Sequence, residues 1–128
     1  MDGKPRVLVV DDEELSQDFL RFFLSQRFEV YTVGTVNAFY NIIAKLDFDI
    51  ILMDISLRDA KDGIQLTKEL KASKKFENTA IFIITAYNTT KEMKMASDAG
   101  ADQFLTKPID MKILMKSIDK VLAEKNVV

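Results

Sequence analysis

Short apolar runs alternate with longer segments of helical periodicity along the whole sequence. Five of the runs read as β-strands, at about residues 6–10, 28–32, 50–53, 80–84 and 102–106. The segments that follow them carry apolar residues at three- and four-residue spacing, which predicts helices at about residues 13–26, 36–46, 62–75, 90–99 and from 110 onward. Parallel strands need crossover connections of this length, so the alternation predicts an α/β domain with a parallel sheet.

The five predicted strands differ in how completely apolar they are. Residues 50–53 and 80–84 are apolar throughout, as in central strands that are covered on both faces. Residues 28–32 alternate more and residues 102–106 are more polar, which suits the two edges of a sheet. The prediction is a flavodoxin-like, doubly wound sheet of five parallel strands in the order 2-1-3-4-5, with five helices. We expect a single domain over residues 1–128, with its core at about residues 6–123.

Local signals indicate several helix ends and faces. Asp62, with Gln65 three residues later, is typical of a capping box, and Gly100 closes the fourth helix in the usual C-terminal position. Four apolar residues of the first helix fall on one face, and a stripe of this kind usually faces the core. They are Leu15, Phe19, Phe22 and Phe23. The inward positions expected in the last helix are Leu114, Ile118, Val121 and Leu122.

Composition removes several classes of chemistry. The chain has no cysteine and no histidine, which excludes disulfides, Ser-His-Asp and Cys-His catalysis, and histidine-bound metals. A metal would have to be held by oxygen ligands, as magnesium, calcium and manganese are. The net charge of −2 gives no reason to expect nucleic-acid binding, and no apolar run is long enough to span a bilayer. We therefore expect a cytoplasmic domain that binds neither nucleic acid nor membrane.

Charged or hydroxylic residues stand where four of the apolar runs end. Asp11 and Asp12 follow the first strand, Asp54 ends the third, Thr85 ends the fourth and Lys107 follows the fifth. Each of them alone could be a helix cap, a strand residue or a solvated surface side chain. In a doubly wound sheet, however, the carboxyl ends of the strands meet in one crevice, where ligand sites are built. The sequence therefore predicts that these five side chains form a site.

Three carboxylates in one crevice favour a bound cation. At about 4 Å and an effective dielectric of about 20, two such charges repel by roughly 4 kcal/mol. A divalent ion with all-oxygen ligands relieves this repulsion, and magnesium prefers such ligands. With a lysine and a hydroxyl nearby, the site suits phosphoryl transfer, in which positioning and charge neutralisation dominate. Asp54 is the best candidate for the nucleophile, because it lies on the central strand and carboxylates form acyl phosphates.

Six short segments stand out by their order and spacing: Val9-Val10-Asp11-Asp12-Glu13, Met53-Asp54-Ile55, Asp62-Gly63-Ile64, Ile84-Thr85-Ala86, Ala99-Gly100-Ala101 and Phe104-Leu105-Thr106-Lys107-Pro108. Together they resemble the receiver domain of bacterial-type response regulators. The resemblance extends over about residues 6–123. It implies that Asp54 accepts a phosphoryl group from a phosphohistidine of a sensor histidine kinase or a histidine phosphotransfer protein. It also implies a magnesium ion held by Asp12 directly, by Asp11 mainly through water, by Asp54, and by the backbone carbonyl of Ser56.

The same resemblance implies how the site acts and is read. Lys107 would pair with the phosphoryl oxygens, and Thr85 would hydrogen-bond to them after the transfer. Phe104 would be the aromatic residue whose rotamer follows Thr85. A downstream protein or a second copy would then bind through the fourth helix, the fifth strand and the last helix. The peptide bond before Pro108 is expected to be cis. From their positions two residues after Asp54 and Thr85, we also expect Ser56 and Tyr87 to flank the path of hydrolytic water.

Two departures and three alternatives accompany this interpretation. The loop after Asp54 reads Leu57-Arg58 where a Met-Pro pair is common, and residue 104 is Phe where Tyr is frequent. A degenerate receiver that acts only as an interaction scaffold is one alternative, although the key residues are all present. A haloacid-dehalogenase-like phosphatase is another, but it normally needs a second Asp two residues after the first, where this chain has Ser56. A flavodoxin-like cofactor module is the third, but the four acidic residues at 11–14 would repel a phosphate.

Overall fold

The computed structural model describes residues 3–86 and 89–125 of the chain. Its strands are β1 (Arg6–Val10), β2 (Glu29–Val33), β3 (Ile50–Asp54), β4 (Ala80–Thr85) and β5 (Gln103–Thr106). Its α-helices are α1 (Glu14–Leu24), α2 (Val36–Ile43), α3 (Gly63–Ala72), α4 (Thr90–Ala99) and α5 (Met111–Lys125), and a short 3-10 helix spans Lys74–Phe76. These elements confirm the predicted alternation, with boundaries that shift by at most three residues.

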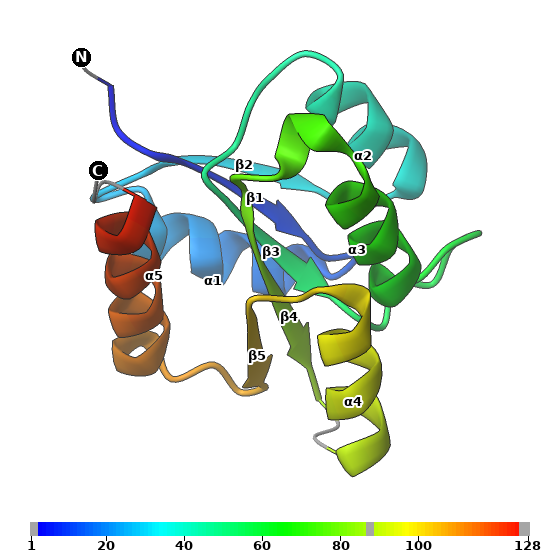
Figure 1. The fold of residues 1–128 in the computed structure, drawn as a ribbon. Helices are drawn as coiled ribbons and strands as arrows, with labels where there is room; N and C mark the ends of the chain where they lie inside the picture. Colours follow the sequence, from blue (N-terminus) through cyan, green and yellow to red (C-terminus); the bar gives the residue numbers. More distant parts are fainter. Residues whose placement is uncertain (1–2, 87–88, 126–128) are drawn as a thin grey trace.

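All five strands lie in one parallel sheet, in the order β2-β1-β3-β4-β5 (Figure 1). The prediction of a flavodoxin-like doubly wound fold with this strand order is confirmed. Val10 pairs with Met53, Asp54 with Ile84, and Thr85 with Thr106. Because the strands are parallel and in register, their last residues line up along one edge. We call this the carboxyl edge of the sheet, and the opposite one the amino edge.

Helices cover both faces of the sheet and enclose two separate cores (Figure 1). On one face, α2, α3 and α4 pack with residues such as Phe39, Leu66 and Ala96 against the strands. On the other face, α1 and α5 do so with residues such as Leu24 and Ile118. Successive residues of a strand point to opposite faces, so a strand covered on both faces needs apolar residues at successive positions, as β3 and β4 have before their last residues, Asp54 and Thr85. This explains why β3 and β4 are buried along their entire length.

The apolar stripe expected to anchor α1 in the core faces solvent instead, so that expectation was wrong. Leu15 is 84% exposed and Phe22 is 69% exposed, whereas Leu20 and Leu24 of the same helix are buried. Phe19 and Phe23 are also exposed, and their rings are in contact at a tilt of 59°, with a centroid distance of 4.8 Å. Helical spacing identifies two apolar stripes on α1 and does not say which one packs. The direction in which the chain leaves β1 decides this.

The other local signals hold. The Asp62 side chain accepts from the backbone N–H of Gln65 while the Gln65 side chain accepts from that of Asp62, which is the predicted capping box. Gly100 ends α4 in the left-handed region, with φ of 99°, where a side chain would be strained. Helix α3 ends earlier than predicted because Ser73 adopts an extended conformation. Within the described residues, no helix is long and apolar enough to cross a membrane.

Candidate functional site

The carboxyl edge brings the predicted acidic residues and the lysine together. Asp11 directly follows β1, and its backbone N–H donates to the carbonyl oxygen of Val33 on β2 at 3.1 Å. Asp54 is the last residue of β3 and is buried, with 4% of its surface exposed. Lys107 follows β5, and its backbone N–H donates to the carbonyl oxygen of Thr85 at 2.7 Å. The sheet therefore fixes the backbone of all three groups before any side-chain contact forms.

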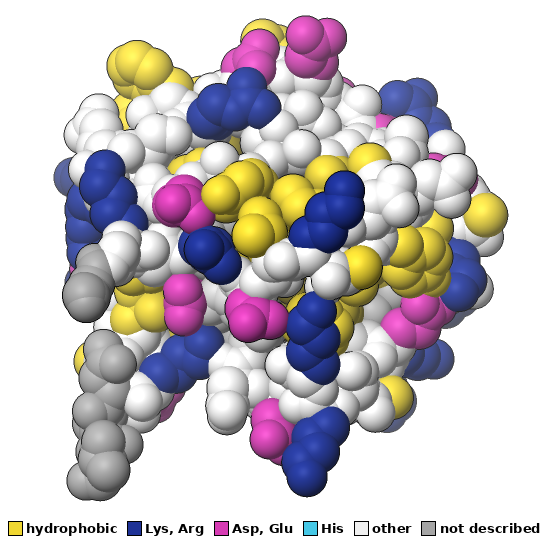
Figure 2. Space-filling view, turned by 90° about the horizontal axis from the view of Figure 1, so that it is seen from above, with side chains coloured by type: hydrophobic (Ala, Val, Ile, Leu, Met, Phe, Trp, Pro, Cys, Tyr) yellow, Lys and Arg dark blue, Asp and Glu magenta, His cyan; other side chains and the backbone are white. Residues whose placement is uncertain are grey.

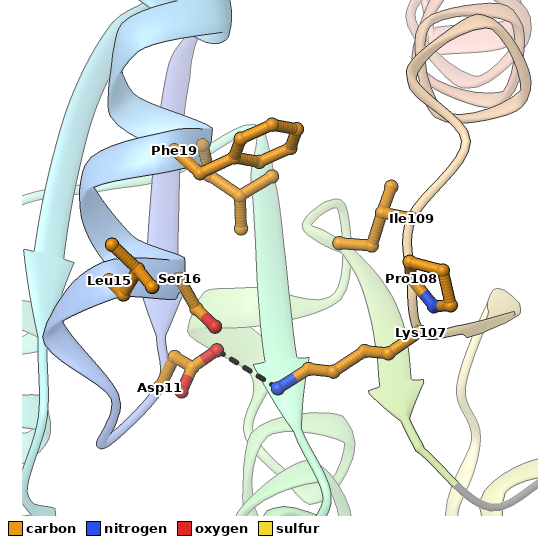
Figure 3. A pocket seen from close by; sticks show the side chains of 8 residues that line it. Asp11, Leu15, Ser16, Phe19, Lys107, Pro108 and Ile109 are labelled. Atoms are coloured by element: carbon orange, nitrogen blue, oxygen red, sulfur yellow. Dashed lines mark hydrogen bonds and ion pairs between the residues drawn. The ribbon is translucent and has the colours of Figure 1, made fainter.

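The ammonium group of Lys107 is the centre of this arrangement. Its Nζ donates to Oδ2 of Asp54 at 3.1 Å and lies 3.3 Å from Oδ2 of Asp11. Figure 3 shows the Lys107 side chain reaching from the segment after β5 toward Asp11. A third carboxylate, that of Glu13, has its Oε1 3.4 Å from the same Nζ. Lys107 thus forms ion pairs with three carboxylates. One of them, Glu13, was not predicted from the sequence to belong to the site.

The second oxygen of each buried carboxylate is held by the backbone. Oδ1 of Asp11 accepts from the N–H of Glu13 at 2.9 Å, and Oδ1 of Asp54 accepts from the N–H of Ser56, also at 2.9 Å. These bonds are made two residues along the chain, as in the turns that Asp favours. They set the rotation of both carboxylates, so that the Oδ2 atoms face Lys107.

Negative charge is in excess at this edge. Asp11, Asp12, Asp54 and Glu13 lie around two cations, Lys107 and Arg58, which leaves two negative charges unbalanced. Burial, together with the charge of Asp54, raises the pKa of Asp11 in spite of its hydrogen bond from Glu13. Burial works against the charged form of Lys107, but its hydrogen bond to Asp54 and the nearby acids raise its pKa overall. A further cation is therefore electrostatically favoured here.

The carboxylates of Asp11, Asp12 and Asp54 suit a hard metal ion. One oxygen from each of the three lies within 4.8 Å of the others. All-oxygen donors with room for retained water are what magnesium prefers, and the absence of cysteine and histidine leaves no softer ligand. Ser56, two residues after Asp54, lines one cavity together with Asp12 and Asp54. The set of donors predicted from the sequence therefore fits a magnesium ion.

A glycine allows the next helix to start close to Asp54. Gly63 is the first residue of α3, and a Cβ atom there would overlap the backbone carbonyl oxygen of Asp54 and crowd the side chain of Met53. In the sequence, Gly63 stands out only as part of the segment Asp62-Gly63-Ile64. Its physical role is to let α3 pack directly against the end of β3.

A cavity of about 330 Å³ opens over these residues and is lined by Asp12, Glu13, Asp54, Ser56, Arg58, Ala86 and Lys107. Thr85 is not among these lining residues; it is fully buried at the end of β4. Phe104 lies two strand positions before Thr106, is half-buried, and packs against the core on the α2–α3–α4 side. The peptide bond between Lys107 and Pro108 is cis, as the resemblance implies. Tyr87 lies outside the described residues.

A second cavity, of about 300 Å³, adjoins the first on the α1 side. It runs from Asp11 and Lys107 along Leu15, Phe19 and Leu20 of α1 to Pro108 and Ile109 (Figure 3). In Figure 3 the apolar side chains of the helix and of the segment after β5 lie on opposite sides of it. Because Lys107 lines both cavities, the charged site borders an apolar surface.

Comparison with known proteins places this geometry in a family. Residues 7–119 match the family described as response regulator receiver domain. The chemotaxis protein CheY of Halobacterium salinarum is 35% identical over 120 residues, which are 91% of this chain and 96% of that protein. Protein PetR of Rhodobacter capsulatus is 32% identical over 119 residues, 92% of this chain but only 48% of PetR. The chain thus spans about half the length of that relative.

Solved structures agree on the fold. A CheY-like response regulator receiver domain protein from Methanospirillum hungatei JF-1 superposes with a TM-score of 0.87 at 24% sequence identity. The match covers 96% of this chain and 97% of that one. The family match over most of the sequence, together with CheY at 35% identity, leads to one conclusion. This chain belongs to the response regulator receiver domain family.

Proposed function

We propose that this chain is a phosphorelay receiver that accepts a phosphoryl group on Asp54 from a phosphohistidine. The donor would be a sensor histidine kinase or a histidine phosphotransfer protein. The observation that carries the proposal is the Lys107 ammonium, placed 3.1 Å from Asp54 and 3.3 Å from Asp11 in a crevice with an excess of acidic groups. A lysine and three carboxylates are the groups that phosphoryl transfer needs for positioning and charge neutralisation.

Asp54 is the acceptor in this proposal because its position combines burial with access. Its carboxylate is buried at the end of the central strand, yet it lines the cavity that opens to solvent. One of its oxygens attacks phosphorus, and the bond from phosphorus to the donor's imidazole nitrogen breaks, so that the imidazole keeps the electron pair. Lys107 then remains next to the new acyl phosphate and pairs with its oxygens. Thr85, at the end of the adjacent strand, supplies a hydroxyl donor.

Magnesium completes the proposed site. Asp12 would be a direct ligand, Asp11 would act mainly through water, and Asp54 and the Ser56 carbonyl would supply the remaining protein oxygens. When bound, the ion would neutralise the charge of the phosphoryl oxygens and lower the repulsion between the carboxylates. The chain's own residues hold these oxygens in place, through the Glu13 and Ser56 N–H bonds to Asp11 and Asp54.

The test of the proposal is chemical phosphorylation. With magnesium and acetyl phosphate, the protein should gain a single base-labile phosphoryl group, which intact-mass measurement and peptide mapping would place on Asp54. Asp54→Asn should remove the labelling completely. Asp49→Asn, at the other end of the same strand, is the matched control and should be labelled like the wild type. Labelling of the Asp54 variant at the same peptide would overturn the assignment, and a wild type that is not labelled would favour the scaffold alternative.

The exposed stripe of α1 supports a protein donor rather than a free small molecule. Contiguous exposed apolar surface on a soluble domain marks an interaction site, and this stripe joins the phosphoryl site through the second cavity. An apolar helix face of the donor that covers Phe19 and Phe22 would bring its phosphohistidine over Asp54. The stripe therefore has a function that explains why it is not packed in the core.

A substitution in the stripe separates docking from chemistry. Phe22→Glu should leave labelling by acetyl phosphate unchanged, because Phe22 is 69% exposed and lines neither of the two cavities. It should slow transfer from an autophosphorylated histidine kinase that labels the wild type, by roughly tenfold or more, since burying a charge in an apolar interface costs over about 1.4 kcal/mol. Met95→Glu, on exposed α4, is the control. Equal loss with both donors would mean that Phe22 matters for the fold and not for docking.

The output surface in this proposal is formed by α4, β5 and α5. Phosphorylation places charge beside Thr85, and Phe104 lies on the neighbouring strand. A shift of these two residues would change the surface of α4 and β5, where a downstream protein or a second copy would bind.

A further inference from the structure

Arg58 contacts the carboxylate of Asp12. The proposed phosphoryl transfer does not require this contact, and neither does the packing of the fold. The backbone N–H of Arg58 lies 3.2 Å from Oδ2 of Asp12, and its side-chain Nε lies 3.1 Å from the same oxygen. Among the described residues, the Asp12 side chain accepts two hydrogen bonds, and Arg58 donates both of them. The two residues are 46 positions apart in the sequence, so the contact depends on the fold alone. A residue proposed to be a metal ligand is thus paired with a cation from this chain.

The loop around Arg58 is held firmly, but the Arg58 side chain is not. The preceding residue, Leu57, is buried in the core. The following residue, Asp59, accepts from the N–H of Val36 at the start of α2, at 2.9 Å. The Arg58 side chain, in contrast, is 82% exposed, while that of Asp12 is only 18% exposed. The backbone therefore keeps the guanidinium near Asp12, and no packing keeps the guanidinium from leaving.

A magnesium ion and the Arg58 guanidinium would compete for the same carboxylate oxygen of Asp12. Magnesium binds carboxylate oxygens at about 2.0–2.1 Å and demands near-octahedral geometry, which leaves little room for a donor on the same oxygen. The two cations would also repel each other across that oxygen. Arg58 lines the cavity that contains Asp54 and Lys107, so a released guanidinium stays at its mouth.

We propose that Arg58 is an exchangeable counter-ion of Asp12: its guanidinium pairs with this carboxylate in the metal-free protein and is displaced when magnesium binds. The inference rests on the proposed function, because it takes Asp12 as a magnesium ligand. Its consequence is that the chain weakens its own affinity for magnesium, since each binding event must break the pair. A proline at this position, as in the Met-Pro pair common in related loops, would offer neither the N–H nor the charge.

Magnesium affinity measured on charge variants tests the exchange. Arg58→Gln keeps the backbone N–H and most of the side-chain length but removes the charge, and it should bind magnesium roughly three- to fivefold more tightly, the range of an exposed ion pair. Arg58→Lys keeps the charge and should stay within about twofold of the wild type. Arg27→Gln is the matched control, because Arg27, in the segment after α1, pairs with Asp119 of α5 and its substitution changes the net charge equally. The advantage of Arg58→Gln should shrink in about 1 M salt.

A second measurement follows the guanidinium itself. Of the four arginines in the chain, only Arg58 should show a change in its Nε–H NMR signal as magnesium is added, and Arg58→Lys identifies that signal. An unchanged Arg58 signal at saturating magnesium, or an Arg58→Gln affinity equal to that of the wild type, would overturn the exchange. If Asp12→Ala also loses magnesium binding in that case, the proposed metal site still stands. If the wild type itself does not bind magnesium, the proposed function fails as well.

Discussion

Aspartates stand at both edges of the sheet, but the number of cations available to their carboxylates differs between the two edges. At the amino edge, just before β3, Oδ2 of Asp49 accepts from the backbone N–H of Arg6 at 2.9 Å. Just before β5, Oδ2 of Asp102 accepts from the N–H of Ile81 at 2.8 Å and from Nζ of Lys71 at 2.9 Å. Each carboxylate there satisfies the unpaired N–H of a neighbouring strand and also has a basic side chain nearby. These two aspartates accept hydrogen bonds from strand backbone groups, and each has a basic partner, so neither leaves an unbalanced charge.

At the carboxyl edge, Asp54 ends the same β3 that Asp49 precedes, yet it shares one lysine with Asp11 and Glu13. The difference lies in the number of carboxylates per cation and in burial, since the side chains of Asp11 and Asp54 are each 5% exposed. Figure 2 shows a face of the molecule on which basic side chains lie next to acidic ones, so opposite charges are close together on that face. An excess of buried negative charge lowers the stability of the metal-free fold, and it creates the affinity for a cation on which the proposed function depends.

Removal of ligands at the carboxyl edge should produce the largest effect. Asp12→Ala should weaken magnesium binding by roughly tenfold or more, because it removes a direct ligand of the proposed site. Asp11→Ala should weaken it less, since Asp11 acts through water and the other oxygens remain. Amide NMR titration with magnesium, followed at Ser56, measures both constants. Asp49→Ala at the amino edge is the control and should bind magnesium like the wild type. Equal affinities of the two carboxyl-edge variants would contradict the division of roles.

The same isosteric change should affect stability with opposite signs at the two edges. Asp102→Asn loses the charge pair with Lys71 and should lower the free energy of unfolding by about 0.5–1 kcal/mol. Asp11→Asn removes a carboxylate whose pKa is raised by burial and by Asp54, so without magnesium it should leave the protein as stable as the wild type or more so. Urea unfolding in EDTA measures both. Destabilisation by both variants would mean that the carboxyl edge carries no excess charge.

Magnesium provides the internal check on this pair of variants. In saturating magnesium the order should reverse for the carboxyl edge, because the wild type gains binding energy that Asp11→Asn partly loses. The gap between Asp102→Asn and the wild type should stay as it was in EDTA.

Periodicity and strand-end residues were enough to predict the strand order, the two edges and the main members of the site. Strand ends are predictable because a parallel sheet places them at one edge whatever the side chains do. Contacts that depend on loop paths were not predictable: Arg58 on Asp12, and Glu13 on Lys107, join residues 46 and 94 positions apart. The prediction of which face of α1 is buried was wrong for a related reason. The helix has two apolar stripes, and the path of the chain after Val10 determines that Leu20 faces the sheet.

The smallest expected effect is also the one that reaches farthest from Asp54: the change of α4 and β5 on phosphorylation. Thr85 is fully buried at the end of β4, and its carbonyl oxygen accepts from the N–H of Lys107 at 2.7 Å. A phosphoryl group on Asp54 would offer the Thr85 hydroxyl a charged acceptor, and movement of Thr85 toward it would free space for Phe104. A full swing from 1:99 to 99:1 needs about 5.5 kcal/mol, whereas one hydrogen bond to a charged group supplies about 1.5–3 kcal/mol. We therefore expect a partial shift unless a partner binds.

Amide NMR with magnesium, with and without beryllofluoride as a phosphoryl mimic, measures this shift against the comparison of the two edges. Signals from the loop around Asp54 and from residues 93–104 should change, while the amides of Arg6 and Ile81 at the amino edge should not. Thr85→Ala should bind the mimic but lose most of the change at residues 93–104, because the hydroxyl that links the phosphoryl group to Phe104 is gone. Changes confined to the loop around Asp54 in the wild type would mean that Phe104 is fixed core in both states. Changes spread equally to Arg6 and Ile81 would mean that the two edges are not independent, since the sheet would then respond as a whole.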